Sequence, residues 1–552
     1  MVRRLRVVLV AFLVLAALLA AAAPALAVHR PTRVMIVVMD QMKPEYAEQF
    51  NMTNLLWLQK NGVNFPNAIV GHMASTTVIS HNVMVSGQLP KHMGWPDEIF
   101  RDGDNILGYG ENALVGAGDL GYADYVKLIE NMDYPKIGDY LHAKYPEKIV
   151  ACVGIKPYQV ESMAASNADY WVRIGSSKAF DPLVPEVTGK WRTAGGNVPT
   201  YIATDTRFRV STGNAWNTYD TELSSPSWLS PEDGRTSPGT VPGHEGGDAW
   251  VADATTAIME NEDWSGIFVN FPDIDKVGHM WGGGTVDTIA KYGWDPLSIF
   301  DQIHMPFTAK HADDQLGKLI AKLKELGQFD DTLIVVTADH GASYGESFYG
   351  ATTYKSASNN WYAGSWYPGY GTDPHVPNTY PGPPALKPLL DTGNVAFSMQ
   401  SGFISTFLID RSTLKKREAA AVMATLPGVI ATYIRYGDRY KLDSSSSSMT
   451  SAERSWWMAH GQELVDTMCS TSSAEVIGLF ADKVAYGMYA DHGGAQMDDQ
   501  RIPMAWYMPG MKHDVSKESL RLVDIMPTML KAMGIEATDT MDGRAYSLKL
   551  PK

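Results

Sequence analysis

The sequence is short of cysteine, which limits both its cross-links and its choice of metal ligands. Its 552 residues include only two cysteines, Cys152 and Cys469. Two thiols build neither a disulfide framework nor a cysteine-rich metal site. They either pair across a long loop or stay as separate thiols, and the sequence favours neither.

Charge is also scarce, and its balance is acidic. Charged residues make up 19% of the chain and hydrophobic residues 45%, which favours a sizeable core over global disorder. The formal net charge of -15 argues against a nucleic-acid duplex as a partner. A small phosphate substrate stays open, because the charge of a bound metal ion can locally overrule the global field. The oligomeric state stays unknown from the sequence.

Long apolar runs are missing except at the N-terminus, where residues 1–27 have the pattern of a signal peptide. A basic stretch with three arginines precedes an unbroken apolar run at residues 7–23. Residues 25–27 form a small-x-small cleavage site, so the mature chain is predicted to begin at Val28, with an uncleaved anchor as the alternative. No other run of about 18 apolar residues follows. We therefore expect an exported protein, periplasmic or extracellular, without a membrane span after signal cleavage.

Shorter apolar runs recur along the rest of the chain. Buried parallel strands are predicted at residues 34–39, 149–155, 266–271, 332–337 and 502–508. Helices are predicted between them, at residues 140–145, 249–259, 310–326 and 522–533. This alternation predicts an α/β fold, with an open, mostly parallel sheet and helices on both faces. Sites in such folds lie at the carboxyl ends of the strands.

Three stretches interrupt the alternation. Residues 156–248 are rich in Gly, Pro, Ser and Thr, and residues 343–394 are rich in Tyr, Trp, Gly and Pro. Both are predicted to be cap insertions over the site. A serine run at residues 444–448 is predicted to be an exposed linker.

Acids and histidines follow several of the predicted strands. These residues are Asp40, Asp275, His279, Asp339, His340 and His492. Because the carboxyl ends of parallel strands meet at one edge of a sheet, four segments would bring carboxylates and imidazoles together there. Such a mixture of oxygen and nitrogen ligands suits zinc. Taken singly, each residue is explained as well by a helix cap, a turn or a structural histidine.

Small hydroxyl residues mark a candidate nucleophile. Ser75, Thr76 and Thr77 open a segment predicted to be a helix N-terminus, and His81 follows Thr77 by four residues. A helix N-terminus offers free N–H groups and partial positive charge to a phosphoryl group. The alternative is an ordinary helix cap, which the local sequence alone favours.

In this order, the motifs resemble the alkaline phosphatase superfamily, in the branch of nucleotide pyrophosphatase/phosphodiesterases and threonine-type alkaline phosphatases. The likeness extends from about residue 34 to residue 544, with gaps at the insertions. It rests on Thr77-x-x-x-His81, residues 85–87 and 90–94, Asp275-Lys-Val-Gly-His279, Asp339-His340-Gly341 and residues 523–544. The resemblance implies that residues 28–552 form an alkaline phosphatase-like catalytic domain.

The resemblance also implies two metal ions, zinc or another divalent metal. One ion would be held by Asp40, Thr77, Asp339 and His340, and the other by Asp275, His279 and His492. Thr77 would be the nucleophile, activated by its metal, because the spacing to His81 sets the register; Thr76 and Ser75 are the alternatives. The expected reaction is hydrolysis of a small phosphate mono- or diester through a phosphothreonine intermediate.

The match fails at a phosphate-binding position. The branch has an asparagine there, whereas this chain has Glu98 or Asp97. A carboxylate facing phosphate is repulsive unless it is protonated or paired with a cation. Lys156 resembles the phosphate-contacting lysine of the threonine-type enzymes and is a candidate catalytic residue, although Tyr158 stands where they have an arginine. A solvated lysine is the alternative for Lys156.

Other functions compete with a phosphoesterase. The nearest is a phosphonate or sulfate ester hydrolase of the same superfamily, although the sequence lacks the Cys/Ser-x-Pro-x-Arg motif of a sulfatase. A non-catalytic secreted binding protein on this scaffold is the alternative from another class. Seven predicted ligands in two groups argue against that alternative. The preference between monoesters and diesters stays open.

Overall fold

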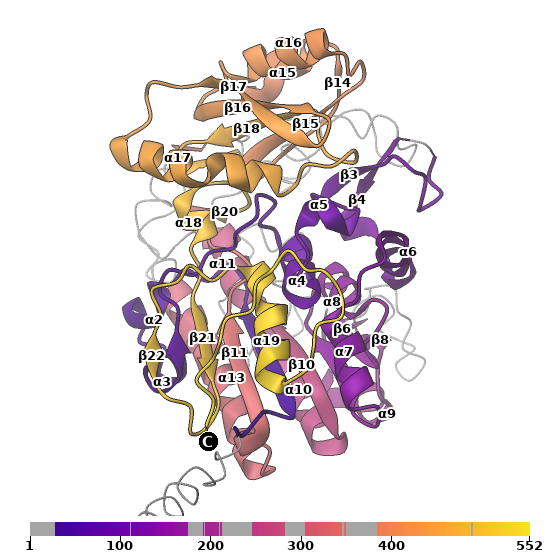
Figure 1. The fold of residues 1–552 in the computed structure, drawn as a ribbon, viewed down its shortest axis with the longest axis vertical. Helices are drawn as coiled ribbons and strands as arrows, with labels where there is room; N and C mark the ends of the chain where they lie inside the picture. Colours follow the sequence, from indigo (N-terminus) through magenta and orange to yellow (C-terminus); the bar gives the residue numbers. More distant parts are fainter. Residues whose placement is uncertain are drawn as a thin grey trace, which may run out of the picture.

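The computed structural model shows a lower body built on one sheet and an upper body built on another (Figure 1). It describes residues 28–110, 112–174, 191–192, 194–208, 210–211, 246–281, 304–344, 347–348, 384–486 and 490–551. The predicted signal peptide, 1–27, lies outside these residues, as does much of the two predicted cap insertions. Among the described helices, none is long and apolar enough to cross a membrane.

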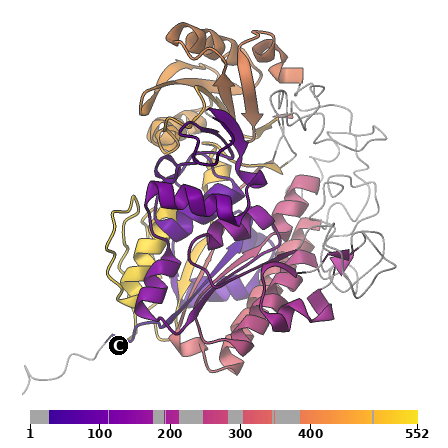
Figure 2. The same cartoon turned by 90° about the vertical axis from the view of Figure 1, so that its right-hand side faces the viewer.

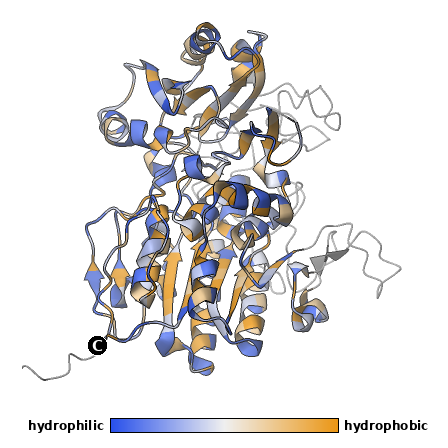
Figure 3. Cartoon of the chain, turned by 45° about the vertical axis from the view of Figure 1, so that its right-hand side comes forward, coloured by the Kyte–Doolittle hydropathy of each residue, from blue (hydrophilic) through white to orange (hydrophobic). Residues whose placement is uncertain are grey.

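The lower body contains, within the described residues, a nine-stranded sheet in the order β22-β2-β21-β11-β1-β10-β5-β6-β8. Its central parallel strands are β11 (Thr332–Thr337), β1 (Arg33–Met39), β10 (Trp264–Phe271), β5 (Ile149–Val153) and β6 (Tyr170–Ile174). All but β6 lie on predicted apolar runs, and Figure 3 shows the strands as largely hydrophobic. The predicted open, mostly parallel α/β sheet is confirmed.

One predicted parallel strand runs the other way. Residues 502–508 contain β21 (Met504–Tyr507), which pairs antiparallel with β11. The prediction of a parallel strand is wrong here, because burial on both faces gives either kind of strand the same apolar composition. The connection sets the direction: the chain enters β21 from α18 (Met497–Gln500), which is hydrogen-bonded to the residues just after β11.

Helices cover both faces of this sheet, as predicted. One group consists of α3 (Thr53–Asn61), α10 (Gly246–Asn261), α11 (Asp273–Trp281) and α13 (His304–Glu325). The other consists of α4 (Thr77–Ser86), α7 (Ile137–Lys144), α8 (Pro157–Ala164) and α19 (Ile525–Met533). Figure 2 shows the sheet between the two groups. The four predicted helices correspond to α7, α10, α13 and α19, the last preceded by the separate turn η9 (Leu522–Asp524).

The first part of the predicted insertion at 156–248 belongs to the lower body. α8 packs against α4, and β6 pairs parallel with β5, with Cys152 beside Trp171. β8 (Ala194–Asn197) closes the edge of the sheet antiparallel to β6. The polar composition of this stretch thus hid a helix and two strands of the main sheet.

The upper body was not predicted. It is a five-stranded antiparallel sheet of β14 (Val395–Gln400), β15 (Phe403–Leu408), β18 (Val476–Phe480), β16 (Val429–Tyr436) and β17 (Arg439–Ser445), in that order. α16 (Thr413–Met423) and α17 (Ser451–Asp466) pack on it over separate apolar clusters. The predicted serine linker, 444–448, begins inside β17, where Ser444 pairs with Thr432 of β16. The serine run is therefore partly sheet and not a boundary between domains.

The remaining described α-helices and β-strands are mostly short. They are α2 (Tyr46–Gln49), β2 (Val63–Asn64), α5 (Pro90–Met93), β3 (Ile99–Asp102), β4 (Ala113–Gly116), α6 (Tyr122–Met132), β7 (Trp191–Arg192), α9 (Thr200–Ala203), β9 (Val210–Ser211), β12 (Ser343–Tyr344), β13 (Ser347–Phe348), α15 (Lys387–Leu390), β19 (Val484–Ala485), β20 (Ala490–Asp491) and β22 (Asp514–Val515). The hairpin of β3 and β4 and the ladder of β12 and β20 lie where the two bodies meet.

Candidate active site

Two neighbouring strands end in the first group of candidate ligands. Asp40 follows β1, and Asp339 and His340 follow β11, which runs parallel beside β1. His340 Nε2 lies 3.5 Å from Asp40 Oδ1 and 3.5 Å from Asp339 Oδ2, and all three side chains are fully buried. Neither of these carboxylate oxygens has a hydrogen-bond partner. Because buried carboxylate oxygens are rarely left unpaired, this arrangement fits a metal site.

The second group forms on the other side of His340. Asp275 lies in the first turn of α11, directly after β10, and His492 Nε2 is 3.8 Å from its Oδ1. The rings of His340 and His492 stack with their centroids 3.7 Å apart. Ligand atoms of Asp275, His340 and His492 lie within reach of one ion, and so do those of Asp40, Asp339 and His340. His340 thus borders both groups, whereas the sequence analysis gave it to the first alone.

His279 joins the second group through Asp275. It follows Asp275 by one helical turn, and its Nε2 lies 2.9 Å from Asp275 Oδ1. Its ring centroid is 5.2 Å from that of His492. The sequence analysis placed His492 after a strand of the main sheet, and that prediction is wrong. His492 follows β20, whose only partner among the described strands is β12, so a small separate ladder delivers this ligand.

The imidazoles of His340 and His492 are neutral, which metal binding requires. Burial lowers the pKa of His340, and burial with the nearby His340 and His279 lowers the pKa of His492 well below its usual range. His340 Nδ1 lies 3.0 Å from the Gly341 carbonyl. Since Nδ1 donates to that carbonyl, the lone pair lies on Nε2, which faces the carboxylates.

Thr77 is the first residue of α4, as the sequence predicted for a helix N-terminus. Thr76 is the extended residue before it, and its side chain makes no cap hydrogen bond. Thr77 Oγ1 lies 3.5 Å from His340 Nε2, and the side chain is almost fully buried. The free N–H groups of the first turn face the same region, so α4 offers partial positive charge to an anion there.

A second layer fixes Thr77 and Asp40. His81 Nδ1 donates to the Thr77 carbonyl at 2.7 Å, one helical turn away. Asn270 of β10 donates to His81 Nε2 at 3.1 Å and to Asp40 Oδ2 at 3.2 Å. Burial lowers the pKa of His81 to about 4, so it stays neutral. Sequence analysis missed Asn270, although a polar residue inside an apolar strand run was a usable signal.

Lys156 lies between the two groups of ligands. Its Nζ donates to Asp40 Oδ2 at 2.7 Å, to Asp275 Oδ2 at 2.8 Å and to Thr77 Oγ1 at 3.1 Å. Burial lowers the pKa of Lys156, but the nearby carboxylates of Asp275 and Asp40 raise it by more. Its pKa therefore lies well above the usual range, and the amine stays charged. The alternative of a solvated surface lysine is wrong, because this side chain is buried.

The structure separates Asp97 from Glu98. Asp97 turns away from Thr77: its Oδ1 accepts the Glu98 N–H at 2.8 Å, and its carboxyl lies near Ser405 of β15. Glu98 lies on the side of Lys156, whose charge lowers the pKa of this carboxyl. Burial raises the pKa of each carboxyl to about 7. Of the two carboxylates that sequence analysis left open, Glu98 is the one near the nucleophile.

The two cysteines lie in different bodies and do not pair. Cys152 is in β5 of the lower sheet, and Cys469 follows α17 in the upper body. Both are buried, free thiols. Of the two alternatives left open by the sequence, separate thiols describe the structure.

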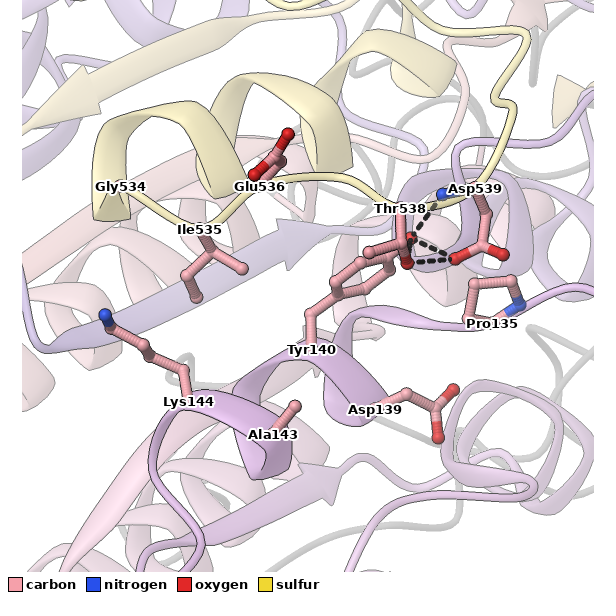
Figure 4. Close-up of a pocket in the computed structure, with 10 residues that line it drawn as sticks. All are labelled: Pro135, Asp139, Tyr140, Ala143, Lys144, Gly534, Ile535, Glu536, Thr538 and Asp539. Carbon is pink, nitrogen blue, oxygen red and sulfur yellow. Dashed lines mark hydrogen bonds between the residues drawn. The ribbon is translucent and has the colours of Figure 1, made fainter.

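A surface pocket of about 420 Å³ lies apart from these residues, between α7 and the segment after α19 (Figure 4). Its polar wall is already satisfied internally, since Tyr140 Oη donates to Asp539 Oδ2 at 2.6 Å and Thr538 donates to the same oxygen. None of its lining residues is a predicted ligand. We therefore assign it no part in the chemistry.

One known family matches part of the chain. The type I phosphodiesterase / nucleotide pyrophosphatase family matches residues 165–354. That segment contains four of the predicted ligands, Asp275, His279, Asp339 and His340. No curated protein sequence matches the chain.

Solved structures match nearly the whole chain. Wild-type alkaline phosphatase PafA aligns with a TM-score of 0.59 and 14% identity, over 92% of this chain and 97% of that one. A PafA variant with four substitutions gives a TM-score of 0.58 and 15% identity over the same shares. Human ENPP5, an ectonucleotide pyrophosphatase / phosphodiesterase, gives 0.49 and 11% over 93% and 97%. The PafA matches show that this chain has the predicted alkaline phosphatase-like fold.

Proposed function

We propose that the chain is a phosphoric ester hydrolase of the alkaline phosphatase superfamily, and more closely an exported two-metal phosphoesterase; the partial family match and the shared fold support this. It hydrolyses small phosphate mono- or diesters through a phosphothreonine intermediate on Thr77. Export rests on the signal-peptide pattern of residues 1–27, and the parts of 156–248 and 343–394 beyond the main sheet are proposed to cap the site.

One observation supports this function above all others. A hydroxyl, an ammonium group and two acid–histidine groups converge from six separate segments of the chain. Thr77 Oγ1 lies 3.1 Å from Lys156 Nζ and 3.5 Å from His340 Nε2, the imidazole that borders both groups. A helix N-terminus, a fixed cation and candidate metal ligands around one hydroxyl suit transfer of a phosphoryl group.

The residues present fit two divalent ions, with zinc favoured by the mixture of imidazole and carboxylate donors. Asp40, Thr77, Asp339 and His340 would hold one ion, and Asp275, His279 and His492 the other. When bound, the ions lower the pKa of the threonine hydroxyl and stabilise charge on the transferring group. The unpaired oxygens of Asp40 and Asp339 support this assignment.

The chain's own residues then have separate tasks. Thr77 Oγ gives its proton to solvent and forms a bond to phosphorus, while the bond from phosphorus to the leaving oxygen breaks and that oxygen leaves as the anion or takes a proton from water. Lys156 stays charged beside Thr77 Oγ1 and stabilises negative charge there, and His81 holds the carbonyl of Thr77 and so the start of α4. Water afterwards displaces the threonine oxygen from phosphorus, which releases phosphate, or a monoester from a diester, and restores the hydroxyl.

The test compares Thr77→Ala with Thr76→Ala, its neighbour and a matched loss of a hydroxyl. Hydrolysis of p-nitrophenyl phosphate and bis-p-nitrophenyl phosphate is measured with added zinc. We expect Thr77→Ala to lose about 10³-fold or more in kcat/KM, and Thr76→Ala to lose far less. Intact-mass analysis of stopped reactions should show one phosphoryl group on wild type and none on Thr77→Ala.

Other results would redirect the proposal. Activity that survives in Thr77→Ala and disappears in Thr76→Ala would move the nucleophile by one residue. A zinc-loaded wild type that cleaves neither ester would favour a phosphonate or sulfate ester as substrate. A chain that binds no metal would favour the non-catalytic binding protein.

A further inference from the structure

Lys136 is a fully buried lysine outside the group of proposed catalytic residues and metal ligands. It is the residue before α7, and its Nζ donates to Asn82 Oδ1 of α4 at 2.9 Å and to the Ser162 carbonyl of α8 at 2.5 Å. Neither acceptor is a carboxylate. Burying an amine costs free energy that two such hydrogen bonds offset only in part. A lysine in this position therefore calls for a reason other than packing.

The amine need not be charged to make these two bonds. Burial lowers the pKa of Lys136 to about 7. A neutral amine keeps two N–H groups, which is one for each acceptor. The link between α4 and α8 is therefore present whether or not Lys136 carries its proton.

The two acceptors of Lys136 are also joined to each other. Asn82 Nδ2 donates to Ser162 Oγ at 2.8 Å, and both side chains are fully buried. Asn82 Nδ2 donates further to the Val78 carbonyl at 2.9 Å, and Ser162 Oγ donates to the Gln159 carbonyl at 3.1 Å. Val78 lies in the first turn of α4, and Gln159 lies in the first turn of α8. The network thus ends in the first turn of each helix.

These two helices carry the reacting hydroxyl and the cation beside it. Thr77 is the first residue of α4, and Lys156 is the residue directly before α8. α4 and α8 pack side by side (Figure 1). Thr77 Oγ1 lies 3.1 Å from Lys156 Nζ. Because each group lies at the start of its helix, the relative position of the two first turns sets this distance.

We infer that Lys136 is a positioning residue for the proposed reaction: through Asn82 and Ser162 it fixes α4 against α8. It thereby holds Lys156 Nζ at the hydroxyl of Thr77. This inference rests on the proposed function. Lys136 affects the rate through the two helices and not through the substrate. A misplacement of about 1 Å between reacting groups can cost about 10²-fold in rate, so even a small loosening of this network is measurable.

The test is a double-mutant cycle on the mature, metal-loaded chain, with p-nitrophenyl phosphate and bis-p-nitrophenyl phosphate as substrates. Lys136→Met keeps the apolar stem and removes both donors. We expect kcat and kcat/KM to fall together by about tenfold at unchanged metal content, because the alignment matters only during the transfer. In a Lys156→Met background the same substitution should lower kcat by less than about twofold, since the group that Lys136 aligns is then missing.

A milder variant tests the same network. Ser162→Ala removes the hydroxyl that joins Asn82 to Gln159 but keeps the carbonyl that accepts from Lys136. It should lower kcat less than Lys136→Met does, and its effect should likewise shrink in the Lys156→Met background. If Lys136→Met does not fold, Ser162→Ala carries the cycle alone.

A control on the same helix separates positioning from packing. Ser86 Oγ donates to the Asn82 carbonyl at 2.6 Å and accepts the Gln88 N–H at 3.2 Å, at the end of α4 away from Thr77. Ser86→Ala removes these buried hydrogen bonds, so it should lower the melting temperature. Its kcat should stay within about twofold of wild type, because the first turn of α4 keeps its bonds.

Three results overturn the inference. They are a folded, metal-loaded Lys136→Met with wild-type kcat, a loss of kcat that is equally large in the Lys156→Met background, and an equal loss of kcat in Ser86→Ala. Failure of the proposed function has a different signature, because wild type would then cleave neither ester or Thr77→Ala would keep its activity. In that case the inference falls with the proposed function.

Discussion

The two bodies of the molecule bury charge in different ways. In the lower body, Asp40, Asp275 and Asp339 converge after neighbouring strand ends, and Asp40 Oδ1 and Asp339 Oδ2 have no hydrogen-bond partner. In the upper body, both oxygens of the fully buried Glu475 are matched, by Arg435 at 3.0 Å and by Arg101 at 3.3 Å. Charge that is left unmatched marks a site for a ligand, whereas charge that is matched internally fixes a shape. The comparison assigns chemistry to the lower body and structural support to the upper one.

The largest effect on activity in this comparison is expected from Lys156. Lys156→Met keeps the apolar stem but removes the cation between Asp40 and Asp275 and the donor beside Thr77. We expect kcat/KM for ester hydrolysis to fall about 10²- to 10³-fold in the metal-loaded enzyme. Steady-state kinetics measure the loss, and Lys156→Arg, which keeps the charge, should retain more activity than Lys156→Met. Equal, wild-type rates in both variants would show that the lysine has no part in the chemistry.

A substitution in the upper body should change the stability of the protein more than its catalytic rate. Glu475→Gln leaves the buried Arg101 and Arg435 without their carboxylate, so the free energy of unfolding should fall by about 3–5 kcal/mol. The folded fraction should keep kcat within about tenfold, because Glu475 makes no contact with Thr77. Denaturant unfolding and kinetics on the same samples measure the two effects.

A matched control for this prediction lies on α16. Glu418 pairs with Lys415 in an exposed position, so Glu418→Gln should leave the free energy of unfolding nearly unchanged. If Glu475→Gln abolished turnover in protein that stays folded, the division between the two bodies would break down.

The smallest effect should come from the cysteines, one in each body. Because Cys152 and Cys469 are free, a reducing agent should leave the melting temperature unchanged. Two thiols per chain should react with a thiol reagent after unfolding without reductant. A titration that finds no reactive thiols would mean that a disulfide bond joins the two bodies.

The lower body could be predicted because its sequence signals are local. A buried parallel strand is an unbroken apolar run, and an acid or histidine placed directly after it lies at a known edge of the sheet. That reasoning was sufficient for Asp40, Asp275 and Asp339. It was not sufficient for the direction of β21, because direction depends on a connection and not on composition.

Other features left no local signal. The strands of the upper body include polar residues such as Ser398, Ser405 and Thr432, so their composition did not indicate a second sheet. The bond of Asn270 to both Asp40 and His81 joins residues far apart in the sequence. Glu98 and Asp97 are adjacent acids, and only the fold decides which of them faces the nucleophile.

The position of the antiparallel strand β21 has a consequence for folding during synthesis. It lies between β2 and β11 in the lower sheet, yet it comes from residues near the C-terminus. A nascent chain therefore cannot close this sheet until almost all of it has been synthesised, and β2 and β11 expose unpaired edges until then. Long-range pairing of this kind also slows folding, because the ends of a very long loop must meet first. The candidate site draws on residues from Asp40 to His492, so it too can be completed only late in synthesis.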